Sequence, residues 1–210
     1  MKSNFAIRAI AVIVATVFVS GAWIQGGKLE LGWLKFFSIA VLAVTVSVTV
    51  WDIWLWRLPL AQLIPGVPRC LRGTWQGVLV SFWINPETGE KLDPKNVYLV
   101  IRQTSSKISV TLLTNESRST SSLADVTTVD DMSQLTYLYL NRPDPRFEVR
   151  SKIHHGSTVL MVSGRPAKRL KGHYWTDRDT KGELDFNTFN KQLADDFEEA
   201  DELFKKQTTT

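Results

Sequence analysis

Two long apolar runs occupy the N-terminal part of the chain. Residues 9–27 carry no charged side chain, and residues 36–56 carry one, Asp52. An α-helix rises 1.5 Å per residue, so about 20 apolar residues cross a hydrocarbon layer roughly 30 Å thick. The pattern therefore predicts two membrane-spanning helices, one in each run.

Only eight residues, 28–35, connect the two runs, which predicts an antiparallel transmembrane hairpin within residues 1–58. Lys2 and Arg8 precede the first run, and Arg57 follows the second. Because basic residues favour the cytoplasmic side of a membrane, we expect a multi-pass protein with both termini in the cytoplasm. A cleaved signal sequence is the alternative for the first run, and the second run that follows almost at once weakens it.

After the second run, prolines and a glycine interrupt the helical pattern, so residues 59–70 are expected to form a linker. Residues 71–190 then alternate apolar and polar positions between turn-forming residues, which is typical of antiparallel strands. Strands are predicted near residues 74–84, 97–103, 108–114, 118–126, 135–141, 149–154 continuing or re-forming at 158–163, 170–176 and 182–186. About eight strands predict an all-β, lipocalin-like closed barrel with room for packed side chains or one small ligand.

The pattern becomes helical again in residues 191–210. Leu193, Phe197, Ala200 and Phe204 recur three or four residues apart among acidic side chains. This spacing places apolar residues on one face of a helix. We expect an acidic helix and tail that packs on or plugs the barrel, with a solvated acidic tail as the alternative.

Charge and cysteine content exclude several classes of protein. The chain has 25 basic and 21 acidic residues, and beyond residue 58 the two kinds are nearly equal in number. A basic face for DNA or RNA is therefore not expected. Cys70 is the single cysteine, which excludes an intrachain disulfide, a cysteine-based zinc site and an iron–sulfur cluster.

No catalytic arrangement of residues emerges from the sequence. His154 and His155 are adjacent, and neighbours on a strand point to opposite faces, so they do not bind one metal ion together. The chain has neither a Gly-x-Ser-x-Gly motif nor a phosphate-binding Gly-x-x-x-x-Gly-Lys loop. A membrane enzyme lacks a visible nucleophile and base, so we predict a protein that is not an enzyme and binds no metal or cofactor.

Strand parity does indicate a binding site. Several strands carry polar or aromatic side chains on the face that would line the barrel. A purely apolar core would not have polar side chains at these positions. Such a set offers stacking faces, hydroxyl donors and one permanent cation, which suits a nucleobase and a phosphate. Tyrosines that pack a core with their hydroxyls at its rim are the alternative. The predicted ligand-binding residues are Ser119, Ser121, Tyr137, Tyr139, Tyr174, Thr176 and Arg178.

Short motifs add a family resemblance that extends over nearly the whole chain. They are Leu-Arg-Gly-Thr-Trp-Gln-Gly at 71–77, Tyr-Leu-Tyr at 137–139, His-Gly-Ser-Thr at 155–158, and Leu-Lys-Gly-His-Tyr-Trp-Thr-Asp-Arg at 170–178 followed by Thr180 and Gly182. With the two N-terminal runs, these motifs resemble the membrane-anchored effectors of CBASS. CBASS is a bacterial antiphage defence in which a CD-NTase enzyme makes cyclic oligonucleotides.

The resemblance implies an eight-stranded barrel that acts as a cyclic dinucleotide receptor, attached to a hairpin in the bacterial inner membrane. It also implies that ligand binding promotes homo-oligomerisation, after which the membrane segments disrupt the lipid bilayer and the infected cell dies. A membrane-tethered, lipocalin-like carrier of a lipid or other hydrophobic ligand is the alternative. The polarity of the lumen distinguishes the two, since inward-facing Arg178, Ser119 and Ser121 favour a nucleotide.

Overall fold

The computed structural model describes residues 2–24, 33–129, 132–148 and 151–208. The chain divides into two compact units, Met1–Val67 and Pro68–Thr210, and each is described by itself. The boundary falls within the predicted linker at residues 59–70.

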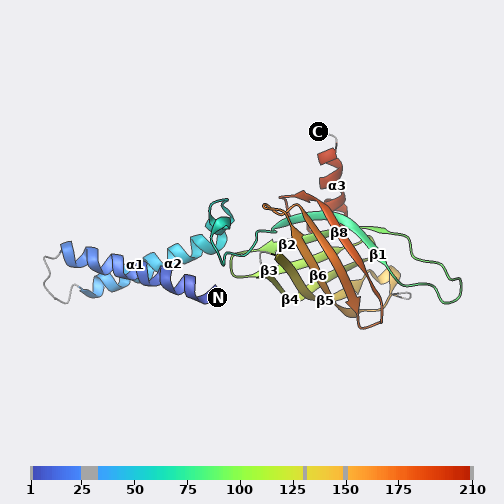
Figure 1. Ribbon diagram of the computed structural model, residues 1–210, viewed down its shortest axis with the longest axis horizontal. Coiled ribbons are helices and arrows are strands. Elements are labelled where there is room, and N and C mark those ends of the chain that lie inside the picture. The colour runs from blue at the N-terminus through green and yellow to red at the C-terminus, as the bar shows by residue number, and fades with distance from the viewer. Residues whose placement is uncertain (1, 25–32, 130–131, 149–150, 209–210) are drawn as a thin grey trace. The chain divides into compact units, whose positions relative to one another are not determined.

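The first unit contains two helices, α1 (Lys2–Ile24) and α2 (Trp33–Ile53), which pack against each other (Figure 1). Two 3-10 turns follow, η1 (Leu55–Arg57) and η2 (Ala61–Leu63). Threonine hydroxyls inside the helices donate to the carbonyl four residues earlier, as Thr45 Oγ1 does to Val41 O at 2.8 Å. These bonds satisfy the hydroxyls without water, which an apolar environment requires.

One segment of this unit, Ser38–Arg57, is long and apolar enough to cross a membrane. In the first helix the corresponding apolar segment is shorter, Ile10–Gly21, within the residues whose side chains are described. The predicted second span is thus matched by length and composition, and the predicted first span is matched only by a helix with a shorter apolar stretch. Most of the predicted connection at 28–35 lies outside the described residues.

The second unit is a closed antiparallel barrel in which each strand pairs with the next and β8 pairs with β1 (Figure 1). The eight strands confirm the predicted fold. They are β1 (Gly73–Ser81), β2 (Lys95–Gln103), β3 (Ile108–Leu113), β4 (Ser117–Val129), β5 (Met132–Pro143), β6 (His154–Ser163), β7 (Arg169–Thr176) and β8 (Lys181–Asn190).

Two predicted strand ends are clearly wrong. The first strand is predicted to residue 84, but β1 ends at Ser81. The sequence also predicts extended chain from residue 149, but β6 begins at His154, residues 151–153 are irregular, and residues 149–150 lie outside the described residues. Earlier in the β5–β6 connection the chain forms the 3-10 turn η3 (Pro145–Phe147). Asp144 accepts a hydrogen bond from Arg146 N at 3.0 Å at the start of this turn, and such local capping competes with strand pairing.

Apolar side chains fill one end of the barrel, where β1 begins. Trp75 Nε1 donates to Leu71 O at 3.0 Å, and Gln103 accepts from Leu71 N at 2.8 Å and donates to Arg69 O at 2.9 Å. These bonds satisfy the polar groups that burial at this end removes from water. The inward side chains that fill this half are Trp75, Val97, Leu99, Ile101, Val110, Val126, Leu135, Tyr137, Leu160, Leu170 and Phe186.

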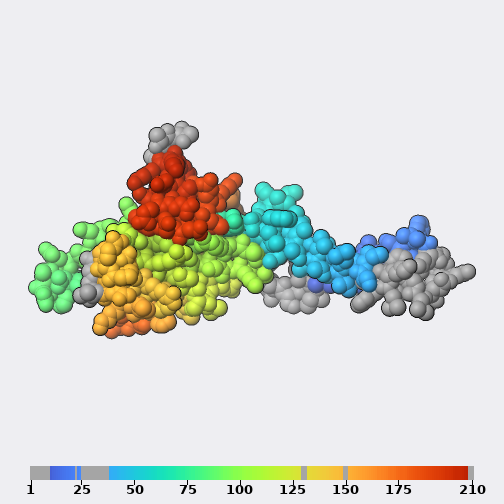
Figure 2. Space-filling model, turned by 180° about the vertical axis from the view of Figure 1, so that it is seen from behind, coloured from blue at the N-terminus to red at the C-terminus, as the bar shows by residue number. Residues whose placement is uncertain are grey.

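The C-terminal helix α3 (Phe197–Thr208) packs on the outside of the barrel (Figures 1 and 2). Its Phe204 stacks on the outward Tyr98 ring with centroids 5.7 Å apart, and Tyr98 donates to Asp201 at 2.9 Å. Burial is the largest cause that raises the pKa of Tyr98 to about 12, so this phenol stays a donor. Of the alternatives for residues 191–210, the packed helix is confirmed, and α3 neither plugs the lumen nor forms a solvated tail.

Candidate functional site

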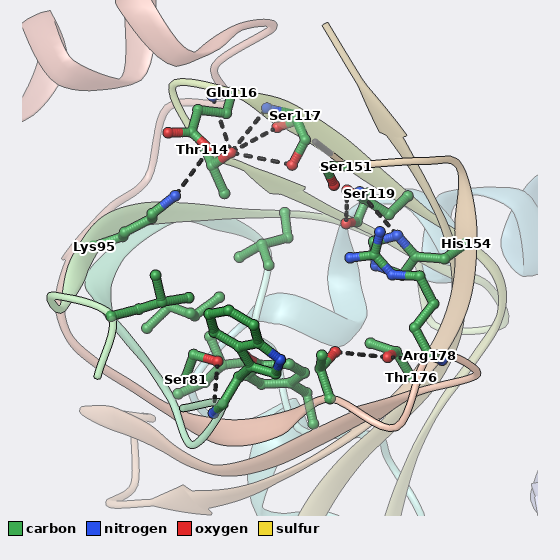
Figure 3. Close-up of a pocket in the computed structure, with 18 of the residues that line it drawn as sticks. Ser81, Lys95, Thr114, Glu116, Ser117, Ser119, Ser151, His154, Thr176 and Arg178 are labelled. Carbon is green, nitrogen blue, oxygen red and sulfur yellow. Dashed lines mark hydrogen bonds and ion pairs between the residues drawn. The ribbon is translucent and has the colours of Figure 1, made fainter. Parts of the chain in front are cut away.

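The other end of the barrel holds a cavity of about 590 Å³ (Figure 3). It lies where the odd-numbered strands end and the even-numbered strands begin, so four strand connections surround its mouth. The volume is within the range of small-molecule sites. Its polar and charged lining residues are Ser81, Asp93, Lys95, Thr114, Glu116, Ser117, Ser119, Asn141, Ser151, His154, Thr158, Thr176, Arg178 and Thr180.

Five of the seven predicted ligand-binding residues line this cavity. They come from three different strands and one turn, and the closed sheet brings them together as parity predicts. The five are Ser119, Tyr139, Tyr174, Thr176 and Arg178. The structure places the other two, Tyr137 and Ser121, outside the lining.

Tyr137 lies one inward position deeper than Tyr139, within the apolar half of the barrel. Its side chain is only 2% exposed, and burial raises the pKa of its phenol strongly. Thr158 is opposite Tyr137 in the sheet, and the nearness of its hydroxyl lowers the pKa of the phenol by a smaller amount. Neither hydroxyl has a hydrogen bond of normal geometry within the described ranges. Parity identifies the face of Tyr137 correctly, but it gives no information on depth.

Ser121 has a structural role at an irregularity of the sheet. A β-bulge lies between Ser121 and Leu123, where two residues of β4 oppose one residue of β5. The β3–β4 ladder ends at the Thr111–Thr120 pair, and Ser121 Oγ accepts a hydrogen bond from Val110 N at 2.9 Å. The hydroxyl thus satisfies a backbone donor that the ladder leaves unpaired, and it does not face the cavity.

Tyr139 and Tyr174 form aromatic walls of the cavity, and each lies against a glycine of the neighbouring strand. Tyr139 is opposite Gly156, and Tyr174 is opposite Gly182. A Cβ atom at Gly156 would lie 2.3 Å from Cζ of Tyr139, and one at Gly182 would lie 2.6 Å from Cε1 of Tyr174. Because no side chain occupies those positions, both rings lie against the barrel wall and leave the lumen open.

Both wall tyrosines keep a protonated hydroxyl. Burial is the largest cause of a raised pKa at Tyr139, and neighbouring phenols and Asp177 raise it further. Burial also raises the pKa of Tyr174. Each residue therefore offers an aromatic face and a hydrogen-bond donor.

A polar network forms the side of the cavity around His154. Ser119 Oγ donates to Asn141 Oδ1 at 2.8 Å, and Asn141 Nδ2 is 3.5 Å from His154 Nδ1. His154 Nδ1 is 3.0 Å from Lys152 O, a contact that requires a proton on Nδ1. Burial is the main cause that lowers the pKa of His154, and the nearby Arg178 lowers it further. The imidazole is therefore neutral near pH 7.

Charged groups lie at two sides of the mouth (Figure 3). At one side Lys95 Nζ forms an ion pair with Glu116 Oε2 at 2.9 Å. At the other side the Arg178 side chain reaches toward His154, and its Nη1 donates to Lys152 O at 3.4 Å. Two permanent cations, at separate positions, thus lie among the lining residues that the structure describes.

The sequence reasoning missed several lining residues. Asn141 shares the strand face of Tyr139, so the same parity could have identified it. Thr158 is 1% exposed, and its hydroxyl has no hydrogen bond of normal geometry within the described part of the chain, but the sequence gives no sign of such burial. Lys95 and Glu116 lie at a strand start and in a turn, outside the predicted strands, and the β2–β3 register extended beyond the Tyr98–Leu113 pair places them opposite each other.

The described residues contain no group of three or more His, Cys, Asp and Glu side chains that could hold a metal ion. His154 lines the cavity, whereas His155 is exposed on the outer face of the barrel. The two rings therefore lie on opposite faces of β6, as adjacent strand positions do.

Comparisons with known proteins match the barrel. The family described as "Cap15, cyclic dinucleotide receptor domain" matches residues 67–188, a range that includes every residue lining the cavity. The chain is also similar to CD-NTase-associated protein 15 of Staphylococcus schleiferi. The two are 27% identical over 155 residues, which cover 74% of this chain and 80% of that protein.

Proposed function

The chain belongs to the Cap15 cyclic dinucleotide receptor family, and from this we propose that it is a CBASS effector whose barrel cavity binds a cyclic dinucleotide. The observation that carries the proposal is the composition of the cavity. It combines the aromatic side chains of Tyr139, Tyr174 and Trp83 with two separate cations and several hydroxyl groups, in one half of a barrel whose other half is filled.

The chemistry of the ligand fits these groups. A cyclic dinucleotide carries two bases and two phosphodiester anions. Tyr139 and Tyr174 supply faces for base stacking, which contributes roughly 1–3 kcal/mol per base. Arg178 supplies a planar donor for phosphate oxygens. The buried Thr158 hydroxyl, without a partner among the described residues, gains a hydrogen bond if a ligand atom reaches it.

The lining favours a nucleotide over a lipid. A lipid carrier needs an open apolar lumen, but the apolar half of this barrel is filled by packed side chains. The open half includes Arg178 and Ser119. These are two of the three polar residues whose inward position was expected to favour a nucleotide over a lipid. Ser121 contributes nothing to this comparison, because its hydroxyl bonds to the backbone.

We assign the first unit to the membrane, with α1 and α2 as the two arms of a hairpin in the bacterial inner membrane and both termini in the cytoplasm. The apolar Ser38–Arg57 segment supports this assignment most directly. A ligand that binds an assembly-competent state more tightly shifts the population toward it. Tethering to one membrane raises the effective concentration of the chains, so a modest preference drives homo-oligomerisation and bilayer disruption without catalysis.

A vesicle-leakage assay tests this function. The full chain is reconstituted in vesicles that enclose a self-quenched dye, and cyclic di-AMP, cyclic di-GMP and cyclic GMP–AMP are added separately. We expect at least one of them to release the dye, and a linear dinucleotide to release none. Leakage that is the same with and without nucleotide would contradict the proposal.

Gly156→Ala is expected to weaken nucleotide binding while the barrel still folds. The added methyl group meets the Tyr139 ring and pushes it toward the lumen. Partial loss of stacking predicts affinity reduced by up to about 10-fold, measured by isothermal titration of the full chain in detergent. In a Tyr139→Leu background no ring remains to be displaced, so the same glycine substitution should have little further effect.

A further inference from the structure

The Lys95–Glu116 ion pair is the clearest feature of the cavity that the proposed ligand contacts do not explain. Both residues line the cavity, and their side chains are partly buried, Lys95 at 39% and Glu116 at 24% relative exposure. A carboxylate here faces the binding site of an anionic ligand, where it repels the phosphates. A carboxylate at this position therefore weakens ligand binding unless it has another function.

A rigid turn holds Glu116 in this position. Thr114 Oγ1 accepts hydrogen bonds from Glu116 N at 3.1 Å and from Ser117 N at 2.9 Å. Glu116 O accepts another from Asp144 N at 2.8 Å, which ties the turn to the end of β5. The backbone therefore directs the Glu116 side chain toward Lys95, the first residue of β2 (Figure 3).

The charges of the described lining residues balance. Lys95 and Arg178 supply two positive charges, Asp93 and Glu116 supply two negative charges, and His154 is neutral near pH 7. Among these residues, Glu116 offsets the attraction of Lys95 for an anionic ligand. Arg178 can serve one phosphate, and Lys95 can serve a second if it changes partner.

We propose that Lys95 is a second phosphate subsite, across the cavity from Arg178, and that Glu116 is a built-in competitor that a ligand phosphate displaces. Lysine binds phosphate as a point charge, so exchange of a carboxylate for a phosphate oxygen needs little rearrangement. The two subsites match the two phosphates of a cyclic dinucleotide, whereas a ligand with a single phosphate occupies only one. Glu116 thereby raises the ligand concentration at which the receptor is half occupied. This inference rests on the proposed function.

The test compares the affinity of the full chain in detergent for cyclic di-AMP, cyclic di-GMP and cyclic GMP–AMP by isothermal titration. Glu116→Gln should bind the active nucleotide roughly three- to fivefold more tightly, because the ligand no longer breaks an ion pair. Lys95→Met should bind it more weakly. In the double variant the gain from Glu116→Gln should disappear, since no ammonium remains to be released.

Asp93→Asn is the matched control, because it removes one negative charge from the lining without removing the partner of Lys95. A gain equal to that of Glu116→Gln would show a general charge effect and overturn the inference. Unchanged or weaker binding by Glu116→Gln, with an unchanged melting temperature, would also overturn it. If the wild-type chain binds none of the three nucleotides, the proposed function itself fails. That outcome is distinguishable from failure of the Lys95–Glu116 inference, in which the wild-type chain still binds.

Discussion

Arg178→Ala is expected to weaken cyclic dinucleotide binding roughly 10- to 100-fold, the effect of losing hydrogen bonds to a charged group. The β7–β8 turn presents this side chain at the mouth. Thr176 N donates to Thr180 O at 2.9 Å, and Arg178 N donates to Thr176 Oγ1 at 3.2 Å. The guanidinium is exposed and contributes little to packing, so isothermal titration of the variant reports binding and not unfolding.

Two further variants make this result specific. Arg178→Lys keeps the charge but loses the planar fork, so it should recover only part of the affinity. Arg169→Ala removes an exposed arginine that pairs with Asp185 on the outer face, and it should leave binding unchanged. Equal affinities for Arg178→Ala and the wild-type chain would show that the mouth arginine does not contact the ligand.

Tyr139→Leu is expected to weaken binding by about 5- to 100-fold. Leucine retains an apolar side chain on this inward position, so the barrel should fold, but it offers no aromatic face for a base. Tyr139→Phe keeps the face and should retain most of the affinity, apart from one hydroxyl donor. The same titration measures all three proteins, and nucleotide-triggered vesicle leakage should follow the same order.

Tyr137→Phe is the matched control for Tyr139. Its hydroxyl is buried and makes no hydrogen bond of normal geometry to any residue that the structure describes, so its removal should leave the melting temperature equal or higher. Because Tyr137 lies below the cavity, nucleotide affinity should not change. A large loss of affinity in Tyr137→Phe would mean that the ligand reaches deeper than the cavity described here.

The fold was predictable because the alternation of side chains and the turn residues act locally. Period-two patterns identified all eight strands. Because exposed sheet edges are unfavourable, these strands were predicted to close into a barrel, as they do. Boundaries failed where local bonding competes with the ladder, as before His154, where Ser151 N donates to Phe147 O at 2.9 Å and residues 151–153 are irregular. The apolar spacing that ends at Phe204 predicted α3, but which face of the barrel it covers depends on the distant Tyr98 and Val100.

The site was predictable only in part, for related reasons. Parity placed Tyr139 and Tyr174 on the face that lines the cavity, because strand geometry fixes the direction of their side chains, whereas Arg178 lies in the β7–β8 turn, beyond the end of the strand. Parity fails at a β-bulge, and at the bulge in β4 the Ser121 hydroxyl bonds to the backbone N–H of Val110 and does not face the cavity. Parity also does not predict how far along the barrel axis a side chain lies, and Tyr137 lies in the filled half. The ion pair of Lys95 and Glu116 joins residues 21 positions apart that lie outside the predicted strands, where the extended β2–β3 register places them opposite each other.

The central claim is that the open half of this barrel is a receptor for a cyclic dinucleotide. Isothermal titration of the full chain in lipid nanodiscs with cyclic di-AMP, cyclic di-GMP and cyclic GMP–AMP tests it most directly. The account predicts saturable binding of at least one of them, with one ligand per barrel and an affinity roughly 10- to 100-fold lower in Arg178→Ala. Binding of a fatty acid in the same cavity, with no heat from any cyclic dinucleotide, would contradict it.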